Sequence, residues 1–117
     1  MTNNFLMSEL HQFTGTENWY QHWLGFTYTD GVKYLAQQAG AYWLIDAIGS
    51  YQKASIKEIT IQFWRLTVNE DKSAVLQMRE DSDRPSRVSQ KIAYTDFPLK
   101  EIELYFSNNV LLLPSEY

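Results

Sequence analysis

The spacing of apolar residues changes once along the chain, near Lys57, and this change restricts the possible folds. Before it, apolar residues recur three or four positions apart, as on the buried face of a helix. They are Val32, Leu35, Ala36, Ala39, Trp43, Ala47 and Ile48. After it come short runs rich in β-branched and aromatic residues, which are typical of strands. This order predicts an α+β domain in which N-terminal helices pack on an antiparallel sheet of about five strands, in two layers.

The main helix has a defined start and two possible courses. Thr29 is a suitable N-cap, and Asp30 then lies in the first turn, where the helix dipole favours a negative charge. The helical spacing continues through Gly40. We therefore expect either one helix to about Gln52 or two helices nearly in line with a break at Gly40.

The residues before this helix predict a short helix and a strand. Ser8 is a suitable N-cap for a helix over Glu9 to Phe13. The residues from Asn18 to Tyr28 are rich in aromatic and β-branched side chains, which favours a strand. After the helices, the expected strands cover residues 59–68, 74–79, 88–94, 102–106 and 110–113. A polar run joins the first two strands as a hairpin. Asn108-Asn109 suits a tight turn between the last two, because asparagine tolerates positive φ.

Composition excludes several classes of protein. The chain has 117 residues, which suits a single domain over residues 1–117. Cysteine is absent, which excludes disulfides and a cysteine nucleophile, and two histidines are too few for a three-histidine metal site. No apolar run is long enough for a membrane span, and the start lacks the features of a secretory signal, so we expect a cytoplasmic protein. The net charge of −4 and scattered basic residues argue against nucleic acid as a partner.

The strand expected at residues 59–68 carries large apolar groups on both faces. Phe63 points to one face, and Trp64 and Leu66 point mainly to the other, because successive side chains alternate. A sheet covered on one side normally has a polar opposite face. Either residues 1–26 cover the second face, with Phe5, Leu6, Trp19, Trp23 and Phe26 as covering material, or a partner does. In the second case Trp64, Leu66 and Tyr105 are the candidate interface residues.

Several segments resemble one family of proteins. They are Tyr28–Ala36, Ala41–Ile48, Phe63–Val68, Tyr94–Leu99 and Leu112–Tyr117. The sequence resembles a family of short bacterial proteins, frequent in cyanobacteria and often found on plasmids, that is catalogued only as a domain of unknown function. The resemblance covers Phe13 to Tyr117. It implies a single cytoplasmic domain and an accessory or anti-defence (anti-CRISPR-like) role on mobile genetic elements, and it supplies no activity, cofactor or catalytic residue.

The polar residues that could carry chemistry are His22, Asp30 and Asp46. The histidines and nearby carboxylates match no metal-ligand spacing, and no Gly-x-Ser-x-Gly motif exposes a nucleophile, so we assign no metal, cofactor or catalytic residue. Asp46 lies in the most apolar helical segment. Three alternatives are open for Asp46. Its carboxylate faces water or hydrogen-bonds a tyrosine or backbone group, it is a buried polar group that stabilises the fold, or it is a catalytic acid.

These observations favour a non-enzymatic protein–protein interaction module that binds a protein partner or forms a homodimer. The alternative is a small enzyme or small-ligand binder with a pocket between helix and sheet. His22, Asp30 and Asp46 would then be the polar candidates in that pocket.

Overall fold

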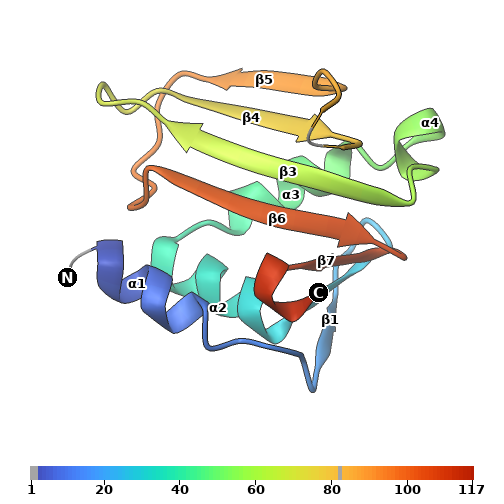
Figure 1. The fold of residues 1–117 in the computed structure, drawn as a ribbon, viewed down its shortest axis with the longest axis horizontal. Helices are drawn as coiled ribbons and strands as arrows, with labels where there is room; N and C mark the ends of the chain where they lie inside the picture. Colours follow the sequence, from blue (N-terminus) through green and yellow to red (C-terminus); the bar gives the residue numbers. More distant parts are fainter. Residues whose placement is uncertain (1–2, 82) are drawn as a thin grey trace.

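The structure is a computed structural model that describes residues 3–81 and 83–117, with a seven-stranded sheet at its centre (Figure 1). The strand order is β1-β2-β7-β6-β3-β4-β5. The strands are β1 (Trp19–Gln21), β2 (Thr27–Thr29), β3 (Ile61–Val68), β4 (Ala74–Arg79), β5 (Val88–Ile92), β6 (Glu101–Ser107) and β7 (Val110–Leu112). All neighbours are antiparallel except β2 and β7, which are parallel.

The sheet therefore differs from the expected five antiparallel strands in both number and direction. The single strand predicted within residues 18–28 is a hairpin, because Gly25 takes a φ of +98° and the chain turns back on itself. The second strand of this hairpin then pairs with β7, aligning Thr27 with Val110 and Tyr28 with Leu111. A pairing across more than 80 residues leaves no local mark in the sequence. The turn at Asn108-Asn109 is confirmed, with φ values of 53° and 64°.

Four α-helices and one 3-10 helix complete the described part of the chain. They are α1 (Asn3–Leu10), α2 (Asp30–Ala39), α3 (Tyr42–Ser50), α4 (Ala54–Lys57) and the 3-10 helix η1 (Pro114–Glu116). The prediction that Ser8 begins a helix is wrong, because α1 already covers this residue and ends at Leu10. None of the helices in the described part has the length and apolar character needed to cross a lipid bilayer.

The ends of α2 follow the sequence signals closely. The Thr29 hydroxyl accepts a hydrogen bond from the Val32 N–H, which confirms Thr29 as the N-cap. Gly40 has φ 61° and ψ 39°, and its N–H donates to the Ala36 carbonyl. This left-handed conformation is easily adopted by glycine and ends the helix. Of the two predicted courses, the break at Gly40 is therefore the one observed.

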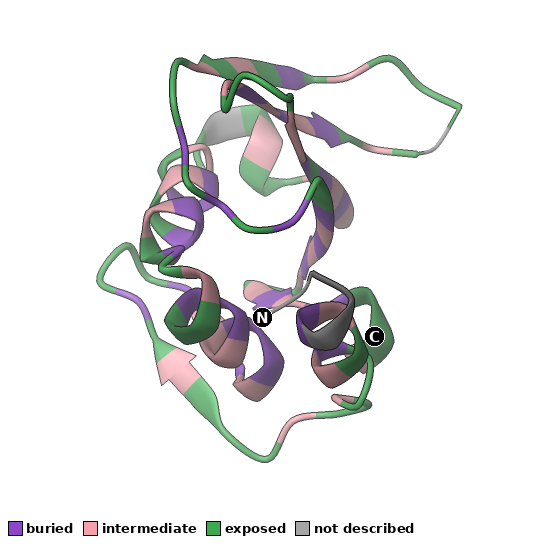
Figure 2. Ribbon diagram, turned by 90° about the vertical axis from the view of Figure 1, so that its left-hand side faces the viewer, coloured by how far each residue is buried: buried purple, intermediate pink, exposed green. Residues whose placement is uncertain are grey.

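The core lies between the sheet and the helices α2 and α3. Figure 1 shows β3 and β6 passing in front of α3, so the helices cover the far face of the sheet. Alternate strand residues point into this core and are buried, as the purple bands of Figure 2 show. Those of the central strands are Trp64, Leu66, Leu76, Met78, Ile102, Leu104 and Phe106.

One polar side chain, Gln62, is fully buried among these apolar residues and all of its amide groups are bonded. Its nitrogen donates to the Gln52 side-chain oxygen at 2.8 Å and to the Ile56 carbonyl at 3.0 Å. Its oxygen accepts from the Gln52 amide at 2.8 Å and from the Trp64 indole N–H at 2.9 Å. The network fixes the Trp64 ring and ties β3 to the segment after α3. A buried amide without these partners would be costly.

We expect Trp64→Ala to lower the free energy of unfolding by about 3–5 kcal/mol, because it removes a fully buried ring and leaves a cavity. Urea unfolding followed by circular dichroism measures this change. Trp23→Ala is the matched control, since the Trp23 side chain is 81% exposed, and we expect it to cost less than about 1 kcal/mol. Equal losses in the two variants would contradict the assignment of Trp64 to the core.

Candidate functional site

The face of the sheet opposite α2 and α3 is open, and we call it the open face. It carries the strand residues that alternate with the core positions, including Phe63, Arg65, Glu103 and Tyr105. The aromatic pair is half-buried and the charged pair is about half exposed. The strands therefore place large aromatic side chains on a face that is partly exposed to solvent, where polar residues are more usual.

The described residues of the N-terminal segment do not cover the open face with the side chains expected to do so. Leu6 and Phe26 are buried in the core, and the Phe26 ring packs edge-on against Phe106, which is a core position. Trp19 and Trp23 are 57% and 81% exposed. Phe5 was also expected to contribute, and its side chain lies outside the described residues.

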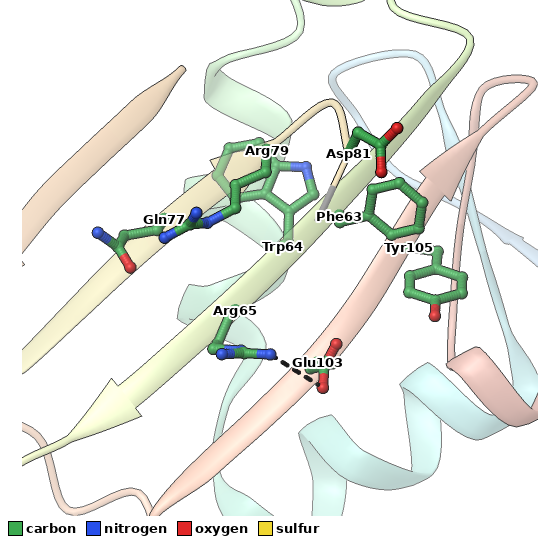
Figure 3. Close-up of a pocket in the computed structure, with 8 residues that line it drawn as sticks. All are labelled: Phe63, Trp64, Arg65, Gln77, Arg79, Asp81, Glu103 and Tyr105. Atoms are coloured by element: carbon green, nitrogen blue, oxygen red, sulfur yellow. Dashed lines mark ion pairs between the residues drawn. The ribbon is translucent and has the colours of Figure 1, made fainter. Parts of the chain in front are cut away.

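A cavity of about 420 Å³ lies on the open face (Figure 3). Strands β3, β4 and β6 form its floor, and Asp81, which follows β4, lies at its rim. The side chains that give the cavity its character are Phe63, Arg65, Gln77, Arg79, Glu103 and Tyr105.

Three aromatic rings form a series along the open face. Phe63 and Tyr105 pair across β3 and β6 with their ring centroids 5.0 Å apart and their planes at 87°. Tyr117 packs on Tyr105 in the same way, at 5.6 Å and 83°. Edge-to-face contacts of this kind are favourable because the positive ring edge meets the negative face. Tyr117 is nevertheless 71% exposed, so the series remains accessible to solvent.

The charges in this cavity are balanced. Arg65 Nη2 lies 3.3 Å from Glu103 Oε1, and the pair bridges neighbouring strands (Figure 3). Arg79 donates to the Arg84 carbonyl at 3.1 Å, which anchors its guanidinium beside the loop after β4. With Asp81, the cavity therefore holds two guanidinium groups and two carboxylates. Its field favours neither an anionic nor a cationic ligand.

Of the three residues predicted for an interface, Tyr105 lies on the open face. Trp64 and Leu66 are each 1% exposed and lie in the core, because their strand positions face the helices. Phe63 occupies the matching place on the open face and was not among the predicted interface residues. The sequence showed that Phe63 and Trp64 point to opposite faces of the strand. It did not show which of these two faces the helices would cover.

His22 and Asp46 form a close pair at the edge of α3. Their Nε2 and Oδ1 atoms are 2.6 Å apart, and the Leu24 backbone N–H donates to His22 Nδ1 with the two nitrogens 3.0 Å apart. Since Nδ1 accepts this backbone hydrogen bond, the neutral ring carries its proton on Nε2 and donates it to Asp46. The imidazole also stacks on Phe26 at 4.5 Å. Both ring nitrogens are engaged, so the ring has no free lone pair with which to act as a base.

Asp30 belongs to a separate network. Its carboxylate accepts hydrogen bonds from the Glu17 and Asn18 backbone N–H groups and from the Tyr20 hydroxyl. The Glu17 bond, followed by the Tyr20 bond, lowers the pKa of Asp30 to about 2, and the same contact raises the pKa of Tyr20. Asp30 therefore fastens the segment before β1 to the start of α2. It does not join His22 and Asp46 in one polar site.

The N-terminus of α2 is occupied by a carboxylate from the same chain. Glu116 accepts hydrogen bonds from the Thr29 hydroxyl at 2.6 Å, the Gly31 N–H at 3.1 Å and the Leu113 N–H at 2.9 Å. A helix N-terminus attracts anions, and here the ligand is internal. Sequence reasoning missed Glu116, because 85 residues separate it from Gly31 and no local signal links the two.

The alternative hypothesis placed a pocket between helix and sheet, and the described residues can be examined for such a pocket and for a metal centre. Within residues 3–81 and 83–117, no three histidine or acidic side chains converge so as to hold a metal ion. The space between helices and sheet is occupied by side chains that are at most 2% exposed. They include Leu35, Leu44 and Ile48 from the helices and Trp64 from the sheet.

The chain matches a model of a known protein family. A family model described as "Family of unknown function (DUF6876)" matches residues 4–117. No curated protein and no solved structure matches the chain.

We expect the contribution of Asp30 to stability to depend on pH. Its pKa is lower in the folded state than the usual 3.8, so the carboxylate stabilises the fold above about pH 4. That stabilisation is lost as the pH falls toward about 2. The difference in urea midpoint between wild type and Asp30→Asn should therefore be largest at pH 5 and shrink by pH 2.

Asp96→Asn, at an exposed position, is the control for this experiment and should differ little from wild type at any pH. A difference for Asp30→Asn that stays constant from pH 5 to pH 2 would contradict the role given to the Asp30 carboxylate.

We expect Glu116→Gln to lower the free energy of unfolding by about 1–2 kcal/mol, because it removes the negative charge at the start of α2 and weakens three hydrogen bonds. Hydrogen exchange at the Gly31 amide should become faster in the same variant. Glu70→Gln, in the exposed turn after β3, is the control and should change neither quantity. Unchanged exchange at Gly31 in Glu116→Gln would show that the carboxylate does not hold the helix start.

Proposed function

The chain belongs to the DUF6876 family, and from this premise we propose that it is a non-enzymatic module that binds another protein through the open face of its sheet. The observation that carries the proposal is the series of rings Phe63, Tyr105 and Tyr117 on the face of the sheet opposite α2 and α3. Aromatic residues and arginine are enriched in the centres of protein interfaces, and Arg65 and Arg79 lie beside the rings.

The shape of the open face supports a macromolecular partner. The cavity is partly open to solvent, and strand side chains form its floor. Small-molecule sites usually enclose most of the ligand. A partner's protruding loop or helix would cover the rings and displace water from them, which is the main source of affinity at such surfaces.

The charges support a protein partner over RNA. Sheets that bind RNA use exposed aromatics for base stacking, and Phe63 and Tyr105 resemble such a platform. Phosphate binding also requires an excess of basic residues. Here Arg65 pairs with Glu103, the cavity is balanced, and the whole chain carries a net charge of −4.

The polar residues support a role without catalysis. The His22 ring uses both nitrogens in structural hydrogen bonds, and Asp30 has its own separate network. A catalytic site needs an acid, base or nucleophile that converges with others on one point. The polar candidates predicted from the sequence instead form hydrogen bonds that hold loops and helix ends in place.

Site-specific photo-crosslinking tests the proposal. We expect a photoreactive phenylalanine analogue in place of Tyr105 to form crosslinks to a protein in cells, either a different protein or a second copy of the chain. The same analogue at Tyr42 is the matched control, because Tyr42 is also an exposed tyrosine and lies on α3 behind the sheet. Phe63→Ala should abolish the Tyr105 crosslink while the circular dichroism spectrum stays unchanged.

The identified protein is then purified and its affinity measured by calorimetry. We expect Phe63→Ala to weaken binding about 30-fold or more, as for a central aromatic residue of an interface. Crosslinks of equal yield from Tyr42 and Tyr105, or a Tyr105 crosslink that forms only to RNA, would overturn the proposal. Light scattering over a concentration series separates self-association from binding of a different protein.

A further inference from the structure

A second cavity adjoins the open face, and its chemistry differs from that of the first. It has a volume of about 230 Å³ and lies between α1, β6 and η1. Glu103 lines both cavities, so the two form neighbouring parts of one surface. We call the second cavity the α1–β6 pocket.

The walls of the α1–β6 pocket are apolar. Met7 and Leu10 come from α1, Ile102 from β6, and Leu113 and Pro114 from the segment that begins η1. Leu10, Ile102 and Leu113 are buried, so these walls belong to the packed core and are held in place. The Ser115 hydroxyl and the Leu10 carbonyl, 3.5 Å apart, link η1 to α1 across the pocket.

The rim of the pocket is acidic. Glu101 and Glu103 lie at its edge, and both belong to the side of β6 that faces away from α2 and α3. The Glu101 side chain is exposed, and its carboxylate forms no hydrogen bond or ion pair with the described side chains of residues 6–53, 55–81 and 83–117. Glu103 is engaged by Arg65 through one oxygen at 3.3 Å. His11 and Ser115 are the other polar residues at this pocket.

An apolar cavity with a free carboxylate at its mouth fits one type of side chain. Lysine and arginine bury an aliphatic stem against apolar walls and keep a cationic end at the rim, where it meets a carboxylate. An acidic side chain would be repelled by Glu101, and a purely apolar one would leave Glu101 without a partner. The net charge of −4 adds a general attraction for a basic partner.

We propose that the α1–β6 pocket receives a lysine or arginine side chain of the protein that docks on the open face. The stem lies against Met7, Ile102 and Leu113, and the cation pairs with Glu101 and with the free oxygen of Glu103. This inference rests on the proposed function. It adds the chemistry that distinguishes the partner: a basic side chain placed beside the segment that covers Phe63 and Tyr105.

A small probe tests the pocket without a partner. Butylguanidinium imitates the end of an arginine side chain, and butylurea has nearly the same shape without the charge. Titration of each probe into the methyl-labelled full chain, followed by NMR, should shift the Met7, Ile102 and Leu113 methyl signals. We expect butylguanidinium to bind about fivefold more tightly than butylurea, as for a partly exposed ion pair.

Variants of the rim complete this test. Glu101→Gln should remove most of the preference for butylguanidinium. Glu58→Gln should retain it, because the exposed Glu58 follows α4 near the opposite end of β3 from the residue that pairs with Glu101. Equal binding of the two probes, a preference that survives in Glu101→Gln, or the absence of shifts at the pocket methyls would each overturn the proposal.

Selection from a random peptide library separates this proposal from the proposed function. Peptides selected on the wild type and lost on Phe63→Ala identify ligands of the open face. Enrichment of lysine or arginine at one position, reduced on Glu101→Gln, supports the basic side chain. Ligands that depend on Phe63 but lack this enrichment overturn the pocket proposal and leave the proposed function standing. Ligands that are indifferent to Phe63 count against the proposed function itself.

Discussion

The contact between Glu116 and the start of α2 is the interaction on which much of this structure depends. It places a carboxylate where the helix has unpaired N–H groups and a positive dipole end. The same contact fixes η1 beside β2 and β7, which form the parallel pair of the sheet. Because η1 also supplies a wall of the α1–β6 pocket, the contact between Glu116 and α2 connects the helix layer, strands β2 and β7, and the surface next to the open face.

The open face is a consequence of how the chain distributes its apolar material. Of the N-terminal aromatic residues expected to cover it, Phe26 is buried in the core, and Trp19 and Trp23 are exposed. Phe26 completes the core beside Phe106, and His22 stacks on it while holding Asp46. Phe63 and Tyr105 are therefore left to pack on each other. Two aromatic rings that satisfy each other edge-to-face lose less by exposure than isolated ones would, which lets the face remain uncovered in the free protein.

The buried Gln62 explains why the helices cover one particular face of β3. Its four hydrogen bonds are satisfied only when the Gln52 side chain, the Ile56 carbonyl and the Trp64 indole are all in place. A one-residue shift of β3 would bring Phe63 under the helices and carry Gln62 to solvent, with the loss of this network. The hydrogen bonds of Gln62 thus determine which apolar residues of β3 lie in the core and which lie on the surface.

The sequence by itself determined the local elements and several of their ends. Thr29 and Gly40 set the limits of α2, and Asn108-Asn109 set the last hairpin, because capping and positive φ are properties of single residues and their immediate neighbours. The alternation in β3 also predicted two apolar faces. Only the tertiary structure decided which face the helices cover, that residues 19–29 form a hairpin joined in parallel to β7, and that Glu116 binds the start of α2. These outcomes depend on contacts between residues far apart in the chain. No local sequence pattern predicts the free energy of such contacts.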